Sequence, residues 1–202
     1  MDVYLIRHGQ TDGNLAFRHQ HDNSPLNSIG KCQAKAVARR IAKLRPTNIV
    51  SSTNLRAVET TKIIVEHCGR ILPETHPAFE ELRRPRWLTG NRFLHINTIW
   101  YIFRWFFGFK VKGEGESYED FLLRIIEART ILESLPDNSR VVVVSHSVFI
   151  NFFLEHICNN QRMGVFRAFK RIWLVLTLRN GSVTHLRYEN GTEKCGWRVM
   201  GR

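Results

Sequence analysis

Two histidines stand directly after short apolar runs that lie far apart in the chain. His8 follows the run that ends Leu5-Ile6-Arg7, and His146 follows Val141-Val142-Val143-Val144-Ser145. Runs of this kind predict buried parallel strands. The carboxyl ends of parallel strands meet at one edge of a sheet, where ligands bind. We therefore expect His8 and His146 to face one pocket.

Two arginines are placed to hold an anion in such a pocket. Arg7 directly precedes His8, and Arg56 falls in the first turn of a helix predicted to begin near Asn54. A cation at a helix N-terminus opposes the helix dipole. Arg56 is therefore either a solvated surface residue or part of an anion site with the free backbone N–H groups.

This combination of side chains predicts phosphoryl transfer. Flanking cations lower the pKa of a histidine and keep its imidazole neutral, as a nucleophile requires. Arginines can hold the non-bridging phosphoryl oxygens and do the work that metal ions often do. We therefore expect no metal and no cofactor. Glu81, beside Arg83 and Arg84, is the candidate acid for the leaving group.

Hydrophobic periodicity over the rest of the chain predicts helices that alternate with strands. Helices are expected from Ser28 to Leu44, from Asn54 onward, from before Phe121 to Leu135, and over 148–157; strands are expected at 3–6, 48–50, 70–72 and 141–144. Near the C-terminus, 172–178 and 183–188 flank Asn180-Gly181, which predicts an edge hairpin.

The alternation predicts an α/β fold. We expect a three-layer α/β/α sandwich with a mainly parallel central sheet, an antiparallel C-terminal edge hairpin and a helical aromatic-rich insertion near the active site. The 202 residues are predicted to form a single domain, 1–202, with 83–114 as a cap or lid and 113–117 as its hinge.

The stretch from Trp87 to Phe109 is unusually rich in aromatic residues interleaved with arginines. As core or lid it would exclude water from the pocket and contact the organic part of a substrate. It could instead bind an anionic membrane surface or a protein partner. Stacking on single-stranded nucleic acid is the least favoured of these interpretations.

The charge balance favours anionic partners without choosing among them. The chain has 30 Lys+Arg against 18 Asp+Glu, a net charge of +12, and such a surplus attracts phosphorylated substrates, nucleic acid or anionic lipid. No apolar run is long enough to span a bilayer and no signal peptide is recognised, so we expect a cytoplasmic protein.

Metal and disulfide sites are not predicted. The four cysteines are widely spaced, with no CxxC pair, and we expect four buried, reduced thiols rather than a zinc site or a disulfide framework: Cys32, Cys68, Cys158 and Cys195. His19, His21 and Asp22 could bind a metal, but the aperiodic residues around them predict a solvated loop.

Five segments in order resemble the signature of the histidine phosphatase superfamily, also called the phosphoglycerate-mutase-like family. They are Leu5-Ile6-Arg7-His8-Gly9-Gln10-Thr11 with Asn14, the stretch 23–34, the stretch 51–61, Gly115-Glu116-Ser117 with Asp120 and Arg124, and Ser145-His146. The resemblance covers most of the chain. It implies the α/β fold expected above and a reaction through a phosphohistidine.

The resemblance also implies roles for individual residues. His8 would be the nucleophile, and the phosphate pocket would be completed by Arg7, Asn14, Arg56 and His146. Glu81 aligns with the family's acidic residue, with Glu80 as the alternative. The chain departs from the family pattern at Ser147, where many members have glycine, and after Glu81, where Arg83-Arg84-Pro85 replaces a glycine-containing motif.

We expect a phosphomonoester hydrolase that acts on a small phosphorylated metabolite or a phosphoprotein. A phosphoglycerate-type mutase is the alternative, because only the acceptor of the phosphoryl group differs between the two. The chain is short for a cofactor-dependent mutase, which favours the hydrolase. A catalytically idle protein that binds phosphorylated ligands or anionic surfaces is the third possibility, and the retained set of candidate residues argues against it.

Overall fold

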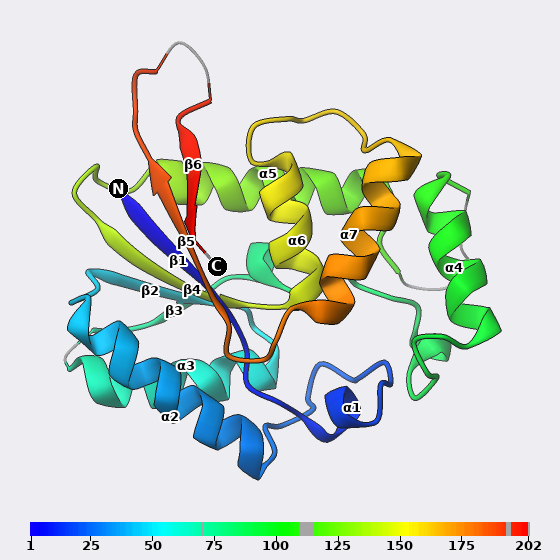
Figure 1. Ribbon diagram of the computed structural model, residues 1–202, viewed down its shortest axis with the longest axis horizontal. Helices are drawn as coiled ribbons and strands as arrows, with labels where there is room; N and C mark the ends of the chain where they lie inside the picture. Colours follow the sequence, from blue (N-terminus) through cyan, green and yellow to red (C-terminus); the bar gives the residue numbers. More distant parts are fainter. Residues whose placement is uncertain (70, 110–114, 193–194, 202) are drawn as a thin grey trace.

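The computed structural model describes residues 1–69, 71–109, 115–192 and 195–201. These residues form a six-stranded sheet with the strand order β3-β2-β4-β1-β5-β6 (Figure 1). The strands are β1 (Asp2–Arg7), β2 (Asn48–Ser51), β3 (Glu74–Thr75), β4 (Arg140–Ser145), β5 (Val183–Tyr188) and β6 (Trp197–Gly201). The first four strands in this order are parallel, whereas β5 runs antiparallel to β1 and β6 antiparallel to β5.

Helices cover both faces of the sheet. They are α1 (Asp12–Leu15), α2 (Ser28–Lys43), α3 (Leu55–Cys68), α4 (Ile96–Phe106), α5 (Tyr118–Glu133), α6 (Ser147–His156) and α7 (Val165–Thr177), with 3-10 turns at Pro77–Phe79 and Arg86–Leu88. Helices α2 and α3 pack on one face, and α5 and α6 pack on the other (Figure 1). The predicted three-layer α/β class is confirmed.

Strand β4 shows why its sequence is an unbroken run of valines. Val142 and Val144 pack into the core on the α2 and α3 side, whereas Val141 and Val143 pack into the core on the α5 and α6 side. A strand covered by helices on both faces needs apolar residues at every position. The run therefore predicted the central strand correctly.

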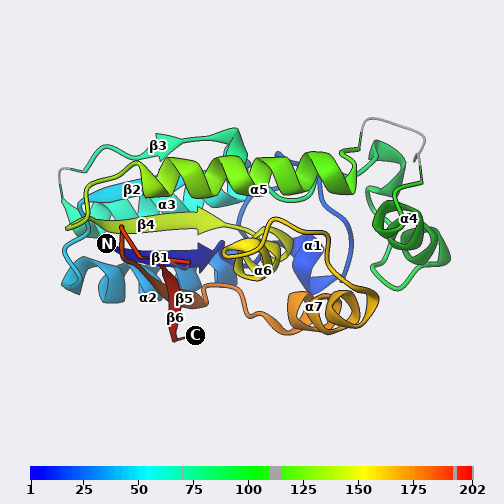
Figure 2. The same cartoon turned by 90° about the horizontal axis from the view of Figure 1, so that it is seen from above.

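The register of the sheet fixes where the two histidines lie. Arg7 pairs with Ser145 across β1 and β4, so His8 and His146 leave neighbouring strands at the same level. Figure 2 shows that α4 lies beyond this end of the parallel strands, on the same side as α1. The aromatic stretch thus contains one helix, α4, and two of its side chains, Tyr101 and Trp105, are buried in the core.

The predicted hairpin between 172–178 and 183–188 is wrong in its first arm. Residues up to Thr177 belong to α7, and the hairpin at the C-terminal edge is built from β5 and β6. A short apolar run does not distinguish a strand from a buried helix segment by its periodicity. Here the run continues a helix that begins at Val165, and its residues pair with no strand.

Two smaller expectations concern connecting segments. The predicted strand at 70–72 is not formed at 71–72, and a two-residue strand, β3, lies at Glu74–Thr75 instead. Arg70 lies outside the described residues, as do residues 110–114 of the predicted cap and its hinge. Among the described helices, none is long and apolar enough to cross a membrane.

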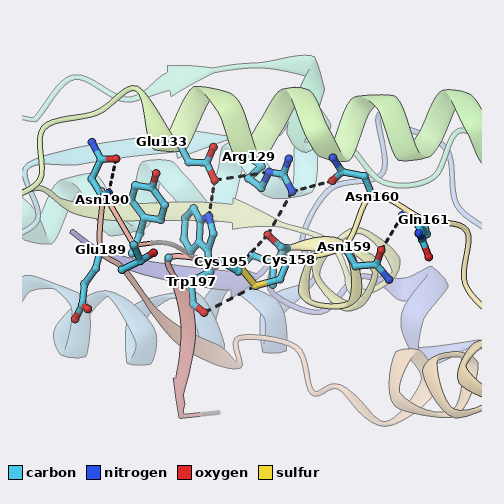
Figure 3. A pocket seen from close by; sticks show the side chains of 15 residues that line it. Arg129, Glu133, Cys158, Asn159, Asn160, Gln161, Glu189, Asn190, Cys195 and Trp197 are labelled. Atoms are coloured by element: carbon cyan, nitrogen blue, oxygen red, sulfur yellow. Dashed lines mark hydrogen bonds and ion pairs between the residues drawn. A yellow bond between two sulfur atoms is a disulfide. The ribbon is translucent and has the colours of Figure 1, made fainter.

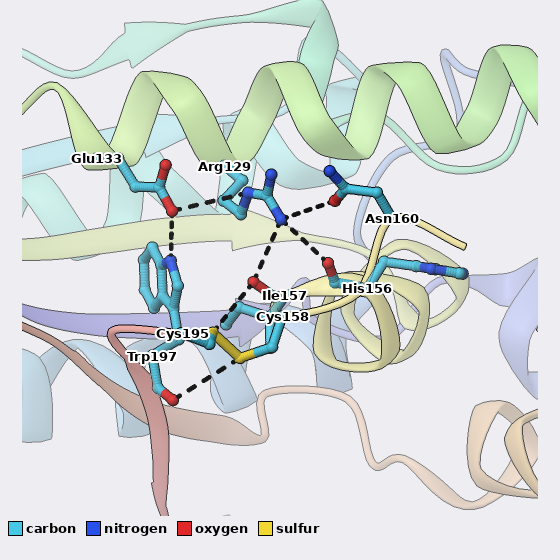
Figure 4. Close-up of a disulfide and its surroundings, with 8 residues drawn as sticks. All are labelled: Arg129, Glu133, His156, Ile157, Cys158, Asn160, Cys195 and Trp197. Atoms are coloured by element: carbon cyan, nitrogen blue, oxygen red, sulfur yellow. Dashed lines mark hydrogen bonds and ion pairs between the residues drawn. A yellow bond between two sulfur atoms is a disulfide. The ribbon is translucent and has the colours of Figure 1, made fainter. Parts of the chain in front are cut away.

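The prediction of four buried, reduced thiols is wrong. Cys158 and Cys195 form a disulfide, with 5.3 Å between their Cα atoms (Figure 4). Cys32 is exposed and Cys68 is half-buried. The bonded cysteines are 37 residues apart, and only the packing of the end of α6 beside the start of β6 brings them together. Spacing in the sequence could not reveal that contact.

Candidate active site

The two strand-end histidines lie side by side in the interior. The centroids of the His8 and His146 rings are 5.0 Å apart, and the ring planes make an angle of 58°. Both side chains are buried, and the His8 backbone N–H donates to the Ser145 carbonyl at 3.0 Å. The structure therefore brings the two candidate histidines together.

The hydrogen bonds of His8 define its tautomer. His8 Nδ1 lies 2.7 Å from the Gly9 carbonyl oxygen, which can only accept, so Nδ1 carries the proton. The other ring nitrogen, Nε2, then holds a lone pair. Burial, followed by the charges of Arg56 and Arg7, lowers the pKa of His8 well below 6.5. The site thus holds a neutral imidazole with an available nucleophilic nitrogen.

Gly9 lets the loop after β1 approach α2 closely. A Cβ at position 9 would lie 2.4 Å from the Gly30 carbonyl oxygen, which is part of the α2 backbone. No side chain can occupy that space without moving the helix. The Gly9 N–H donates to Thr60 Oγ1 on α3 at 3.1 Å, so the loop that presents His8 is held by two helices.

Arg56 is buried in the first turn of α3, as the sequence placed it, and is only 5% exposed. One guanidinium nitrogen donates to the His21 carbonyl at 3.0 Å, whereas Nε is buried with no partner among the described residues. Burial lowers the pKa of Arg56 to about 10, with Glu81 and Asp22 acting in the opposite direction. Arg56 remains a cation, and its unsatisfied donor suits an anion.

Arg7 is the second buried cation of the site. One of its terminal nitrogens donates to the Leu178 carbonyl at the end of α7, and its Nε also has no partner in the described part of the chain. Burial lowers its pKa, while the charge of Glu81 raises it. Two orphaned arginine donors that both act on His8 indicate a pocket for a phosphoryl group or a similar anion.

Arg84 is a third cation near the pocket that the sequence had not assigned to it. The charge of Arg84 lowers the pKa of Arg56. Burial and, as a smaller cause, the charge of Arg84 lower the pKa of His19 to about 3. The only sequence signal was membership of a basic cluster, which usually indicates solvated side chains. Arg84 lies near Arg56 and His19 because of the path that the chain takes after Glu81.

His146 is fixed by a chain of polar side chains that begins at α3. Asn54 donates through Nδ2 to Asp22 at 2.9 Å, which turns its carbonyl oxygen toward the Ser52 hydroxyl at 3.1 Å. Ser52 Oγ therefore accepts from His146 Nε2, 2.7 Å away. His146 Nδ1 is left as a buried atom with no partner among the described residues. Burial and then Arg56 lower the pKa of His146 well below 6.5.

Asn14 is tied to the His8 loop through a residue that the sequence analysis missed. Asn180 donates through Nδ2 both to the His8 carbonyl, at 3.1 Å, and to Asn14 Oδ1, at 3.2 Å. The same Asn14 oxygen accepts from Thr11, which caps α1. The predicted Asn180-Gly181 turn is real, but it joins α7 to β5 and supports His8 rather than closing a hairpin.

Glu81, and not Glu80, faces the pocket. The Glu81 carboxylate accepts from the backbone N–H groups of Val148 and Phe149 in the first turn of α6, at 3.3 and 3.1 Å. Its charge also acts on Arg7 and Arg56. Glu80 instead forms an ion pair with Arg83 at 2.9 Å. Of the two alternatives, the geometry favours Glu81.

The loop that carries Glu81 is held by a buried ion pair. Arg124 pairs with Glu116 at 2.5 Å, and both side chains are 7% exposed. Arg124 also donates to three carbonyl groups of the loop, those of Ala78, Glu80 and Glu81.

Ser147, where the chain departs from the family pattern, donates to the Val175 carbonyl on α7 at 2.6 Å.

Other polar sites lie apart from the histidines. Among the described residues, no group of three or more His, Cys, Asp or Glu side chains is arranged to hold a metal ion. His19 Nε2 instead lies 3.0 Å from Thr98 Oγ1. A cavity of about 700 Å³ lies beside the disulfide, with Arg129, Asn159 and Trp197 among its lining residues (Figure 3). None of the residues assigned above to the phosphate pocket lines this cavity.

Comparisons with known proteins agree with this geometry. The model of the histidine phosphatase superfamily (branch 1) matches residues 3–198. A probable phosphoglycerate mutase, GpmB, of Proteus mirabilis is 30% identical over 94% of this chain and 86% of its own length. A GpmB of Shigella dysenteriae is 30% identical over 98% of this chain and 91% of its own.

Solved structures show the same fold. A protein described as mycobacterial hydrolase 1 superposes with a TM-score of 0.76 at 25% identity, over 98% of this chain and 96% of its own. A mycobacterial glucosyl-3-phosphoglycerate phosphatase in complex with VO3 gives a TM-score of 0.76 at 24% identity, over 99% and 97%. Members of this superfamily are phosphatases or mutases with a histidine nucleophile. Since the family model spans nearly the whole chain, the protein belongs to the histidine phosphatase superfamily.

Proposed function

We propose that the protein is a phosphomonoester hydrolase that works through a phosphohistidine at His8. The observation that carries the proposal is the state of His8: Nδ1 is fixed as a donor to Gly9, and burial and two arginines keep the ring neutral. The substrate class is a small phosphorylated metabolite or a phosphoprotein.

In the first step, His8 Nε2 attacks phosphorus and the bond between phosphorus and the leaving oxygen breaks. Arg7 and Arg56 hold the non-bridging oxygens through the donors that have no partner in the described residues. The two arginines supply the positive charge in this step, so the proposal needs no metal. The leaving oxygen takes a proton from the Glu81 carboxyl or from a monoanionic substrate, whose second phosphate pKa is about 6.

In the second step, water attacks the phosphohistidine, the bond from Nε2 to phosphorus breaks, and inorganic phosphate leaves. Glu81 takes the proton of the water. Its carboxylate accepts from backbone N–H groups of α6, and its charge acts on both Arg7 and Arg56, which supports a position beside the phosphoryl group. Asn14 and His146 bind the phosphoryl group beside these residues.

The test of the nucleophile is phosphate release from a panel of phosphomonoesters. We expect His8→Ala to lower the rate by roughly 10⁴-fold or more, as removal of a nucleophile does in other enzymes. The matched control is His67→Ala, an exposed histidine on α3, which should keep the wild-type rate. Hydrolysis at the wild-type rate by purified His8→Ala would contradict the proposal.

A mutase is the second candidate, and the names of the curated relatives favour it: the GpmB proteins at 30% identity are called probable phosphoglycerate mutases. A mutase returns the phosphoryl group to a substrate hydroxyl, whereas a hydrolase gives it to water. Interconversion of phosphoglycerate isomers that is faster than phosphate release would assign the mutase. Phosphate release with no interconversion would assign the hydrolase.

An idle binding protein remains the candidate of another class. It would bind phosphorylated ligands in the same pocket, but it would release no phosphate and form no phosphohistidine. Absence of turnover over the whole panel, together with tight binding of inorganic phosphate, would support it over both enzymes.

A further inference from the structure

One face of α4 exposes apolar side chains that no described part of the chain covers. Ile96, Ile99, Trp100, Phe103 and Phe107 follow the i, i+3, i+4, i+7, i+11 spacing of a single helix face. We call these five residues the α4 face. Trp100 is 58% exposed and Phe103 is 47% exposed. A contiguous apolar surface on a soluble domain usually marks a binding site.

The opposite side of α4 is firmly anchored, so the α4 face has a fixed orientation. Tyr101 and Trp105 are buried, and Trp105 Nε1 donates to the Glu116 carbonyl at 3.1 Å. The Trp105 ring packs on Tyr118 and Phe152, with centroid distances of 5.0 and 5.7 Å. The α4 face therefore cannot be buried by rotation of the helix about its axis unless these core contacts break.

The chain segment that contains the α4 face is basic and contains no acidic residue. Residues 83–109 include no aspartate or glutamate, and their arginines are Arg83, Arg84, Arg86, Arg92 and Arg104. The Arg104 guanidinium lies 5.9 Å from the centroid of the Trp100 ring, where its stem adds to the apolar surface while its charge stays at the rim. Aromatic residues edged by arginines are typical of helices that lie on a membrane surface.

Exposed arginines beside α4 point to an anionic occupant. Arg18 and Arg92 are both exposed and pair in an isolated antiparallel bridge, and the Arg18 guanidinium donates to the Gly90 carbonyl at 2.7 Å. An anionic surface would complement the positive charge of these arginines. A second copy of the chain would instead place further arginines and another net charge of +12 beside the α4 face, which is unfavourable.

Helix α4 is linked to the phosphate pocket through the loop after α1. Phe17 in this loop is 66% exposed, and the Phe93 N–H donates to the Phe17 carbonyl at 2.9 Å. The same loop continues through His19, which contacts Thr98 on α4, to His21, whose carbonyl accepts from Arg56. A surface that binds the α4 face would lie beside the loop that holds Arg56.

We propose that the α4 face docks on an anionic lipid bilayer. The helix lies along the interface with its aromatic side chains among the acyl chains and its arginines at the phosphate groups. It does not cross the bilayer, in keeping with its 11 residues. The proposal is independent of the proposed hydrolase, because docking needs neither His8 nor turnover.

The test is co-sedimentation of the full chain with phosphatidylcholine vesicles that contain or lack phosphatidylserine, at low and high salt. We expect binding to the anionic vesicles, weakening with salt, and an affinity at least about tenfold lower in Trp100→Ser/Phe103→Ser. The control variant is Leu72→Ser, which changes an 89% exposed leucine in the segment between α3 and β3, away from α4 (Figure 1). It should bind as the wild type does, and thermal unfolding would verify that all variants fold.

Three results would overturn the proposal. The first is no co-sedimentation with anionic vesicles at low salt, or equal binding by Trp100→Ser/Phe103→Ser. The second is a concentration-dependent dimer in analytical ultracentrifugation that the double variant abolishes, with no vesicle binding, which would assign the face to a second copy. The third is binding of a single-stranded oligonucleotide that depends on Trp100 and Phe103 and again occurs without vesicle binding.

Discussion

Arg56 and Arg129 stand near opposite kinds of helix end, and they differ in what satisfies them. Arg129, a residue of α5, donates to the His156 and Ile157 carbonyls at the C-terminal end of α6 and to Asn160 Oδ1 (Figure 4). Its buried Nε makes no hydrogen bond among the described residues but lies 3.6 Å from the Glu133 carboxylate. Arg56 lies in the N-terminal turn of α3, and its buried Nε has no partner among the described residues.

We infer from this difference that Arg129 is a structural cation and that Arg56 belongs to the proposed anion site. A cation near a helix C-terminus satisfies carbonyl groups and complements the helix dipole, so it stabilises the fold. A buried cation near an N-terminus opposes the dipole and leaves a donor unmet, so it costs stability until an anion binds. Residues that break local rules in this way are expected at functional sites. We therefore expect the disulfide end of the molecule to contribute stability and the pocket end to bind an anion.

The largest expected effect that sharpens this comparison comes from Arg56→Met. We predict a loss of phosphatase activity of roughly 10²- to 10³-fold, because a donor to the transferred group is removed. The free energy of unfolding should stay within about 1 kcal/mol of the wild type, since an uncompensated buried charge is lost along with one hydrogen bond. Steady-state kinetics and urea unfolding measure the two quantities.

Arg129→Met is the matched control for that experiment and should show the reverse pattern. Activity should stay within about twofold of wild type, and the free energy of unfolding should fall by about 1–3 kcal/mol, because carbonyl groups lose a charged donor. If both variants lose stability equally and activity equally, the distinction between the two arginines fails.

Removal of the disulfide tests the other end of the comparison. The bond closes a loop with a sequence separation of 37, and in the chain-entropy picture we predict that Cys158→Ser lowers the free energy of unfolding by about 2–4 kcal/mol. The cavity beside it shares no residue with the phosphate pocket, so activity should be unchanged. Cys32→Ser, at an exposed free cysteine, is the control. A large activity loss in folded Cys158→Ser would show that the two ends are coupled.

The smallest expected effect concerns protons at the pocket end. Burial and Arg84 lower the pKa of His19 from 6.5 to about 3. Between these values the unfolded chain binds a proton that the folded chain does not, so His19 stabilises the fold above pH 6.5 and loses that contribution as the pH falls. Its share of the slope is about 1.4 kcal/mol per pH unit in this window.

His19→Gln should therefore flatten the decline of the free energy of unfolding below about pH 6 by about 1 kcal/mol per pH unit. Urea titrations at several pH values measure this slope, with the exposed His67→Gln as the matched control. His8 and His146 add to the same decline, because burial lowers the pKa of each. An unchanged slope in His19→Gln would show that this histidine is protonated in the folded protein.

The sequence was informative where local pattern and strand ends decide the structure. His8, His146, Arg7 and Arg56 converge because two parallel strands end, and one helix begins, at the same edge of the sheet, and the apolar runs in the sequence reveal these elements. Asn180 and Arg84 were missed because the path of a connecting segment places them. The disulfide and α7 were missed for a similar reason. Tertiary packing decides which cysteines come close enough to bond and whether a short apolar run forms a helix or a strand.

The central claim is that the neutral His8 takes the phosphoryl group, and trapping that intermediate tests it most directly. The Glu81→Gln variant, in which removal of the proposed base should slow hydrolysis of the intermediate, is mixed with a labelled phosphomonoester and quenched in alkali. Mass spectrometry then locates the label. We predict an acid-labile phosphohistidine on His8 that disappears in Glu81→Gln/His8→Ala. A label on another residue, or undiminished turnover by His8→Ala, would contradict the account.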